Sequence, residues 1–120
     1  RYLGMDELLQ TVDILSLHLP KNALTLNKKD FRSFGNGKIL VNTSLGLPFE
    51  EEPFDNWISD TSNFAILDGD GKKELKKEIL KKQNIITADK SAGWSSETHE
   101  RLSQKVIENF KSFILDQKKA

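Results

Sequence analysis

Residues 38–46, with the sequence KILVNTSLG, constrain the fold more than any other part of the chain. The apolar run at 39–41 is unbroken and contains β-branched residues, which is typical of a strand covered on both faces by helices. The run stops at the small and polar residues 42–44, and Gly46 follows. Because ligands bind beyond the carboxyl ends of strands in open α/β sheets, this segment predicts a strand that ends at a ligand site. A strand followed by an ordinary turn is the alternative.

Three further apolar runs alternate with helix-like segments along the chain. Strands are predicted at 13–19, 38–42, 63–68 and 84–87, and helices at 5–10, 27–34, 50–59, 72–82 and 95–117. Asn27 is expected to cap the second helix, the third is expected to be interrupted or to begin near Pro53, and Ser95 or Ser96 is expected to cap the last. Right-handed crossovers between such strands predict a parallel sheet with flanking helices. Half of a doubly wound nucleotide-binding domain, a flavodoxin-like domain and a receiver domain all fit this order.

The composition excludes several classes of protein. The chain has 120 residues, 37% of them apolar, which is enough for one domain. Eighteen basic residues balance 18 acidic ones, so nothing favours nucleic acid or an anionic membrane as a partner. The absence of cysteine rules out disulfides and thiolate metal sites, and fits a reducing, cytoplasmic location. No signal peptide or membrane span is apparent, and the opening at Arg1 predicts a fragment of a longer protein.

Two charged segments are better explained without a ligand. The DGDG sequence at 68–71 is weakly similar to a calcium loop, but Lys72, Lys73 and Ile79 stand where that loop needs an oxygen ligand, a glycine and a glutamate. We therefore predict no metal site. The lysine-rich segment 72–82 also contains Glu74 and Glu78, which favours a solvated helix face over an anion-binding patch.

Seven short motifs, taken together, resemble the cofactor-binding domain of the D-isomer-specific 2-hydroxyacid dehydrogenases. They are DILSLHLP at 13–20, NKKDF at 27–31, ILVNTS at 39–44, ILD at 66–68, NII at 84–86, AGW at 92–94 and ERL at 100–102. The resemblance extends over about residues 5–110, with the motifs in the family's order. It implies that residues 1–120 form the second half of a Rossmann-type NAD(P)-binding domain that ends in a long helix at about 95–117. The first βαβ unit, with its Gly-rich phosphate loop, is then missing.

The resemblance also implies a function and a set of cofactor contacts. It implies an oxidoreductase that transfers hydride between NAD or NADP and a small hydroxy or keto substrate, with a homodimeric parent protein. Asp68 matches the residue that holds the nicotinamide carboxamide, Thr43 and Ser44 match the turn beside the nicotinamide ribose, and His18 and Pro20 match the adenine side. Leu45, Ala92 and Gly93 complete the predicted set. From composition alone, His18 is better explained as a core histidine than as a ligand contact, and the resemblance reverses that preference.

The family's catalytic trio is absent. Leu45 occupies the position matched to the substrate-binding arginine, Gly71 the position matched to the glutamate, and Lys90 the position matched to the histidine. An arginine clamps a carboxylate with two parallel hydrogen bonds, which leucine cannot make. A lysine can transfer protons near neutral pH only when burial or a neighbouring cation lowers its pKa from about 10.4.

Two hypotheses follow from this departure. The first is a reductase that acts on something other than a simple 2-hydroxy acid, with Lys90 as its catalytic residue. The second is a non-catalytic cofactor-binding or scaffold protein of the same fold. In either case, residues 1–120 alone are expected to be inactive, because the resemblance implies that half of the cofactor site and the substrate domain are missing.

Overall fold

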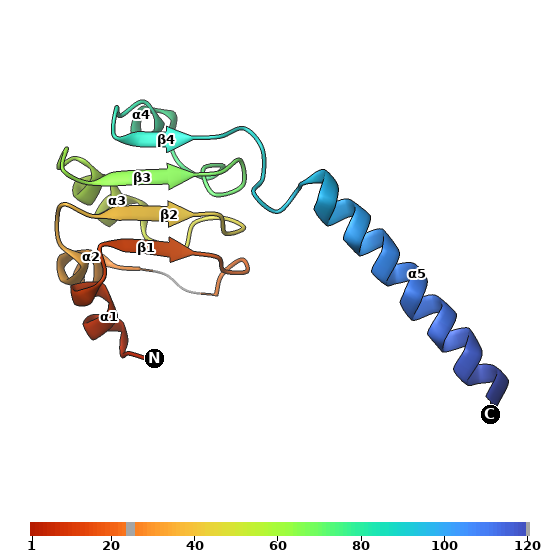
Figure 1. Ribbon diagram of the computed structural model, residues 1–120. Coiled ribbons are helices and arrows are strands. Elements are labelled where there is room, and N and C mark those ends of the chain that lie inside the picture. The colour runs from red at the N-terminus through yellow and green to blue at the C-terminus, as the bar shows by residue number, and fades with distance from the viewer. Residues whose placement is uncertain (24–25, 120) are drawn as a thin grey trace.

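Four parallel strands form a single sheet in the computed structural model, which describes residues 1–23 and 26–119 (Figure 1). The strands are β1 (Ile14–Leu17), β2 (Ile39–Asn42), β3 (Phe64–Leu67) and β4 (Ile85–Thr87), and their order in the sheet is β1-β2-β3-β4. Ile14 pairs with Ile39, and Ile39 with Phe64, so the first three strands begin in register at intervals of 25 residues. The Rossmann-like parallel sheet with flanking helices, predicted from the alternation, is confirmed.

Five helices accompany the strands: α1 (Met5–Thr11), α2 (Lys28–Phe34), α3 (Glu51–Ile58), α4 (Lys77–Leu80) and α5 (Ser96–Lys119). The start of α2 is fixed by a capping box, as the sequence predicted for Asn27. Its side chain accepts a hydrogen bond from the Asp30 amide at 3.1 Å, and the Asp30 carboxylate accepts one from the Asn27 amide at 2.9 Å. Two backbone N–H groups that the helix leaves without partners are thereby satisfied.

Replacing Asn27 with alanine is expected to lower the free energy of unfolding by about 1 kcal/mol, since one half of the capping box is lost. The matched control is Lys28→Ala, one residue further on and exposed, for which we expect a change within about 0.5 kcal/mol. Urea titration followed by circular dichroism measures both. Equal stabilities of the two variants would contradict the assignment of the cap.

Helices cover only one face of the sheet. Figure 1 looks onto the other face, with α2 and α3 behind the strands. Leu40 is fully buried on the helical side, whereas Ile14 and Ile86 on the open side remain 58% and 54% exposed. The sequence prediction of strands covered on both faces is therefore wrong. Every right-handed crossover moves on to the next strand in the same direction, which places all the connecting helices on one side.

An aromatic cluster holds α2 and α3 against the covered face. Phe49 stacks on Phe54 with ring centroids 4.4 Å apart, and Phe34 stacks on Trp57 at 5.4 Å. The Trp57 indole N–H donates a hydrogen bond to the Gly35 carbonyl oxygen at 2.7 Å, which joins the two helices. These contacts hold α2 against α3 and fix Phe49, which precedes α3.

One predicted helix needs correction, and the place of Pro53 in another can now be stated. The helix predicted at 72–82 is only the single turn of α4, because the chain before it forms turns that bring Leu75 into the core and leave Lys76 extended. Pro53 does not interrupt α3, which begins near it, at Glu51, as one of the two predicted alternatives had it. It lies in the first turn of that helix, where a missing N–H removes no intrahelical bond.

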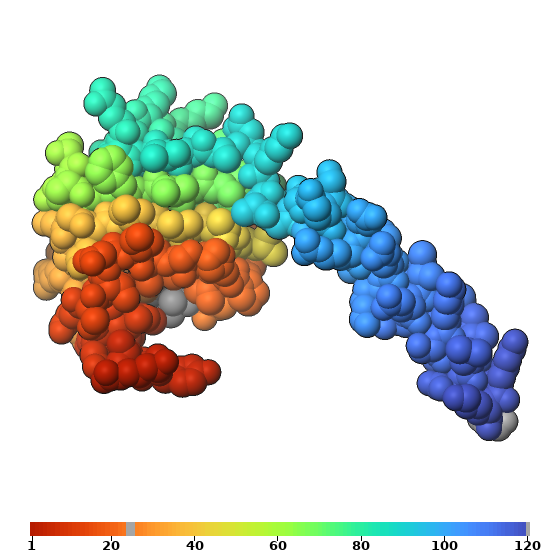
Figure 2. All heavy atoms as spheres, in the orientation of Figure 1, coloured from red at the N-terminus to blue at the C-terminus, as the bar shows by residue number. Residues whose placement is uncertain are grey.

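Helix α5 projects from the rest of the domain (Figures 1 and 2). Ser95 caps it by accepting a hydrogen bond from the Thr98 amide at 3.1 Å. Its predicted apolar stripe is present but remains exposed: Leu102, Val106, Phe110, Phe113 and Ile114. Across the described residues, no helix is both long and apolar enough to cross a membrane.

Candidate functional site

A cavity of about 520 Å³ lies at the carboxyl ends of β1 and β2, where the chain after β4 returns to them. Seven residues line it: His18, Leu19, Pro20, Thr43, Leu45, Ala92 and Gly93. Six of them belong to the predicted cofactor set, although they come from three segments far apart in the sequence. Parallel strands make this possible, because all their carboxyl ends meet at one edge.

Asn42 builds the turn that follows β2. Its buried side chain donates hydrogen bonds to the Gly46 carbonyl oxygen at 3.3 Å and to the Gly71 carbonyl oxygen at 3.1 Å, and accepts one from the Ser44 amide at 3.0 Å. Gly46 adopts a φ of 98°, a conformation that favours glycine. The turn is therefore held from three sides, which presents Thr43 and Leu45 to the cavity.

Ser44 lies behind the cavity wall. It is 3% exposed, and its hydroxyl accepts a hydrogen bond from the Leu19 amide at 2.9 Å. The Leu45 amide donates to the Leu19 carbonyl oxygen at 3.3 Å, which continues the strand pairing past the end of β1. Ser44 thus joins the two strand ends and does not face the cavity.

Asp68 is also buried, and both of its carboxylate oxygens are occupied. One accepts a hydrogen bond from the Gly71 amide at 2.7 Å, and the other accepts one from the Ala92 amide at 2.8 Å. The carboxylate therefore fastens the loop after β3 to the segment after β4. It does not line the cavity, so its geometry fits the positioning of Ala92 better than direct contact with a ligand.

The segment after β4 has two further attachments. The Gly69 amide donates to the Lys90 carbonyl oxygen at 3.0 Å, and Lys72 pairs with Asp89 at 2.6 Å. The hydrogen bond and the charge of Lys72 lower the pKa of Asp89, which keeps this exposed carboxylate ionised. Together with Asp68, these contacts hold Ala92 and Gly93 against the strand ends.

The three positions matched to the family's arginine, glutamate and histidine differ in their exposure, in the space around them and in whether they line the cavity. Leu45 is 58% exposed and borders both the main cavity and a smaller one of about 150 Å³. At Gly71, a Cβ would lie 2.2 Å from the Asn42 carbonyl oxygen, so no glutamate fits there. Lys90 is exposed and does not line the cavity.

Sequence reasoning missed three polar residues near this edge. Ser16 hydrogen-bonds to His18, and the two-residue spacing on a strand was a signal that could have identified it. Lys21 and Glu74 line the smaller cavity and form an ion pair at 3.7 Å. Nothing in the sequence marks Glu74, because its position depends on the turns that replace the predicted helix.

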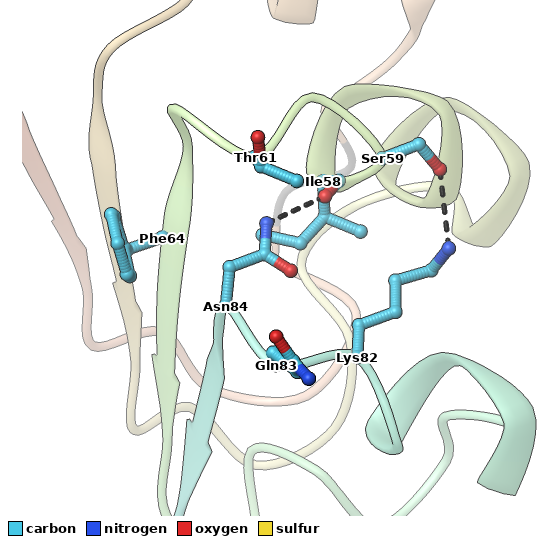
Figure 3. Close-up of a pocket in the computed structure, with 7 residues that line it drawn as sticks. All are labelled: Ile58, Ser59, Thr61, Phe64, Lys82, Gln83 and Asn84. Atoms are coloured by element: carbon cyan, nitrogen blue, oxygen red, sulfur yellow. Dashed lines mark hydrogen bonds between the residues drawn. The ribbon is translucent and has the colours of Figure 1, made fainter.

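A second large cavity, of about 500 Å³, lies at the opposite edge of the sheet (Figure 3). Two of its polar side chains already have partners within the protein. Asn84 donates to the Ile58 carbonyl oxygen at 2.7 Å, and Lys82 donates to the Ser59 hydroxyl at 3.2 Å. Within residues 1–23 and 26–119, no three His, Asp or Glu side chains group in a way that could hold a metal ion. The cavity at the carboxyl ends is therefore the best candidate site.

Comparisons with known proteins agree on the class of relative. The chain is 28% identical over 119 residues to glyoxylate reductase 1 of Saccharomyces cerevisiae. The matched region covers 95% of this chain and 34% of the relative. It is 32% identical over 120 residues to erythronate-4-phosphate dehydrogenase of Escherichia coli O1:K1, covering 92% of this chain and 32% of the relative. The chain thus spans about a third of the length of these curated relatives. No protein-family model matches it.

Solved structures share the fold. D-lactate dehydrogenase of Aquifex aeolicus, complexed with NAD and lactic acid, superposes with a TM-score of 0.71 at 20% identity, over 97% of this chain and 41% of that one. An acyclic imino acid reductase in complex with NADPH and D-Arg superposes with a TM-score of 0.72 at 25% identity, over 95% of this chain and 38% of that one.

Proposed function

The chain belongs to the D-isomer-specific 2-hydroxyacid dehydrogenase family, and from this premise we propose that it forms the nicotinamide side of the cofactor site in an NAD(P)-dependent oxidoreductase. Its homologues are oxidoreductases acting on CH–OH donors. The observation that carries the proposal is the cavity at the carboxyl ends, which gathers six predicted cofactor residues from three segments. Structural neighbours in complex with NAD or NADPH support a nicotinamide dinucleotide as the ligand.

The cavity suits a nicotinamide and its ribose in size and chemistry. Its volume lies within the range of small-molecule sites. Leu19 and Leu45 offer apolar contact to a ring, and Thr43 offers a hydroxyl to the ribose. A Cβ added at Gly93 would have its nearest neighbour 3.9 Å away, so this wall leaves room for a ligand. When bound, the nicotinamide supplies or accepts the hydride, and the protein supplies position and proton transfer.

Binding to the full-length protein that contains this chain tests the proposal. We expect NADH or NADPH fluorescence to rise on binding, and a screen of carbonyl compounds to find one that is reduced. Thr43→Trp, which fills the cavity, is expected to abolish binding. Lys81→Ala, on the exposed surface after α4, is the matched control and is expected to bind normally. Absence of binding to the unaltered protein would refute the proposal.

The substrate is proposed to differ from a simple 2-hydroxy acid. Leu45 offers no charge to a carboxylate, and the position of Gly71 has no room for a larger side chain. The same observations favour the second candidate, a non-catalytic cofactor-binding or scaffold protein. Cofactor binding without turnover of any carbonyl compound would support that candidate instead.

Restoring two of the family's side chains should create activity on a 2-keto acid. We expect Leu45→Arg combined with Lys90→His to raise kcat/KM for a small 2-keto acid by roughly tenfold, because a guanidinium–carboxylate hydrogen bond contributes about 1.5–3 kcal/mol. Leu45→Met combined with Lys90→His, which adds no charge at position 45, is the matched control. An equal kcat/KM for the two double variants would count against the carboxylate clamp.

Other properties of the parent protein are proposed from the resemblance. They are a homodimeric state, a cytoplasmic location and the use of either NAD or NADP. We also propose that residues 1–120 by themselves do not transfer hydride, because they span about a third of the curated relatives. Size-exclusion chromatography of the parent, and an assay of the isolated chain, test these points.

A further inference from the structure

Helix α5 carries an uncovered apolar stripe along its length. None of its residues is buried, and Figure 2 shows the helix extending away from the sheet. The members of the stripe are 39–64% exposed: Leu102, Val106, Phe110, Phe113 and Ile114. Ile107, at the edge of the stripe, is 53% exposed. Because helices in proteins gain most of their stability by packing an apolar face, a helix of 24 residues without such packing indicates an interaction surface.

The stripe is large enough to form an interface. Its five members and Ile107, each roughly half exposed, present roughly 600 Å² of apolar surface, the upper limit of what a soluble monomer usually leaves uncovered. Two such stripes in contact would bury about 1,200 Å², the lower end of the range for stable protein–protein interfaces. The area therefore suits a second copy of the same helix.

The stripe has the same spacing when it is followed in either direction. Four of its members occur at intervals of four residues, symmetrically about position 108: Leu102, Val106, Phe110 and Ile114. In an antiparallel pair of α5 helices, Leu102 of one copy would lie level with Ile114 of the other. Val106 would likewise lie level with Phe110. A two-fold interface needs such a self-complementary surface, because both copies contribute the same patch.

Charges beside the stripe also match in an antiparallel pair. Glu100 and Lys118 are about five full turns apart and therefore lie on the same side of the stripe. A two-fold axis perpendicular to both helices places this side of one helix against the same side of the other. Glu100 of each copy then lies within one turn of Lys118 of the other. Neither side chain forms an ion pair within residues 1–23 and 26–119, so both can pair across the interface.

We propose that α5 pairs antiparallel with α5 of a second copy through this stripe, which makes the protein a two-fold dimer. The inference goes beyond the proposed oxidoreductase function and does not depend on it. Because α5 leads away from the sheet, the two sheets would lie at opposite ends of the helix pair (Figure 1). The positive end of each helix dipole would also lie beside the negative end of the other, which adds to the attraction.

The full-length protein that contains this chain provides the test, and sedimentation equilibrium measures the dissociation constant of its dimer. We expect Phe110→Glu to raise that constant by about a hundredfold or more, because each copy then places a charge in the centre of the interface. Leu115→Glu is the matched control. Leu115 is 57% exposed on the same helix but lies about 140° around it from Phe110, so the constant should not change.

Reversal of the charges beside the stripe tests the orientation of the pair. Glu100→Lys alone is expected to raise the dissociation constant roughly tenfold, because two attractive pairs become repulsive. Glu100→Lys combined with Lys118→Glu should restore the original constant. The two positions are about 27 Å apart along one helix, so only a contact between copies explains such a rescue.

Three results would overturn the inference. The first is a full-length protein that remains monomeric at about 0.1 mM, which would mean that another part of the longer protein covers the stripe. The second is a Phe110→Glu protein that associates as tightly as Leu115→Glu. The third is a double charge variant that associates no better than Glu100→Lys. None of these results bears on cofactor binding, which NADH or NADPH fluorescence tests separately.

Discussion

Asp68→Ala is expected to lower the free energy of unfolding by about 3 kcal/mol and to release the segment that carries Ala92, because each buried unsatisfied donor costs about 1–3 kcal/mol. The carboxylate is 7% exposed and accepts hydrogen bonds from the Gly71 and Ala92 amides. Alanine would leave the buried Gly71 N–H group unsatisfied and would release the Ala92 N–H group, which is only partly buried. Because Ala92 lines the main cavity, we also expect weaker cofactor binding by the full-length protein.

Two measurements check this effect. Urea unfolding gives the loss of stability, and hydrogen exchange of the Ala92 amide reports whether the segment is released. Asp70→Ala is the matched control, since Asp70 is two residues away and only half-buried, and its carboxylate has no hydrogen-bond partner among the described residues. An Asp68→Ala protein whose stability and Ala92 protection match those of this control would show that the carboxylate does not hold the segment.

Gly71→Ala is expected to destabilise the protein by about 3 kcal/mol, the upper end of the range for overpacked sites. Its Cβ would lie 2.2 Å from the Asn42 carbonyl oxygen and 3.0 Å from the Asp68 carboxylate. Neither of these groups can move freely, because the first is backbone at the end of β2 and the second is held by two amides. The strain is therefore steric and would displace the turn that presents Thr43 and Leu45.

Gly93→Ala is the control for this prediction. Its nearest neighbour would be the Ser91 hydroxyl oxygen at 3.9 Å, an ordinary contact, so we expect a change within about 0.5 kcal/mol. Thermal and urea unfolding of the two variants give the comparison. A Gly71→Ala protein as stable as Gly93→Ala would mean that residue 71 has room for a side chain, which would reopen the position to the family's glutamate.

The sequence by itself determined the order and kind of most elements. Apolar runs at regular intervals identified all four strands, and the alternation with helices implied their parallel arrangement. Asn27 marked the start of α2 because capping involves only neighbours in the chain. The strand ends also indicated the edge at which the candidate site lies. These features depend on local patterns and on the handedness common to all crossovers.

The tertiary structure alone decided which side chains face the site. Asp68 and Ser44 follow strands just as Thr43 does, yet they are buried and hold neighbouring segments, while Thr43 faces the cavity. The lack of space for a side chain at Gly71 likewise arises from contacts between segments 20 or more residues apart. The short α4 depends on the turns that bring Leu75 into the core. Local periodicity records which residues are apolar. It carries no information on which backbone carbonyl or amide will lie opposite each of them after folding.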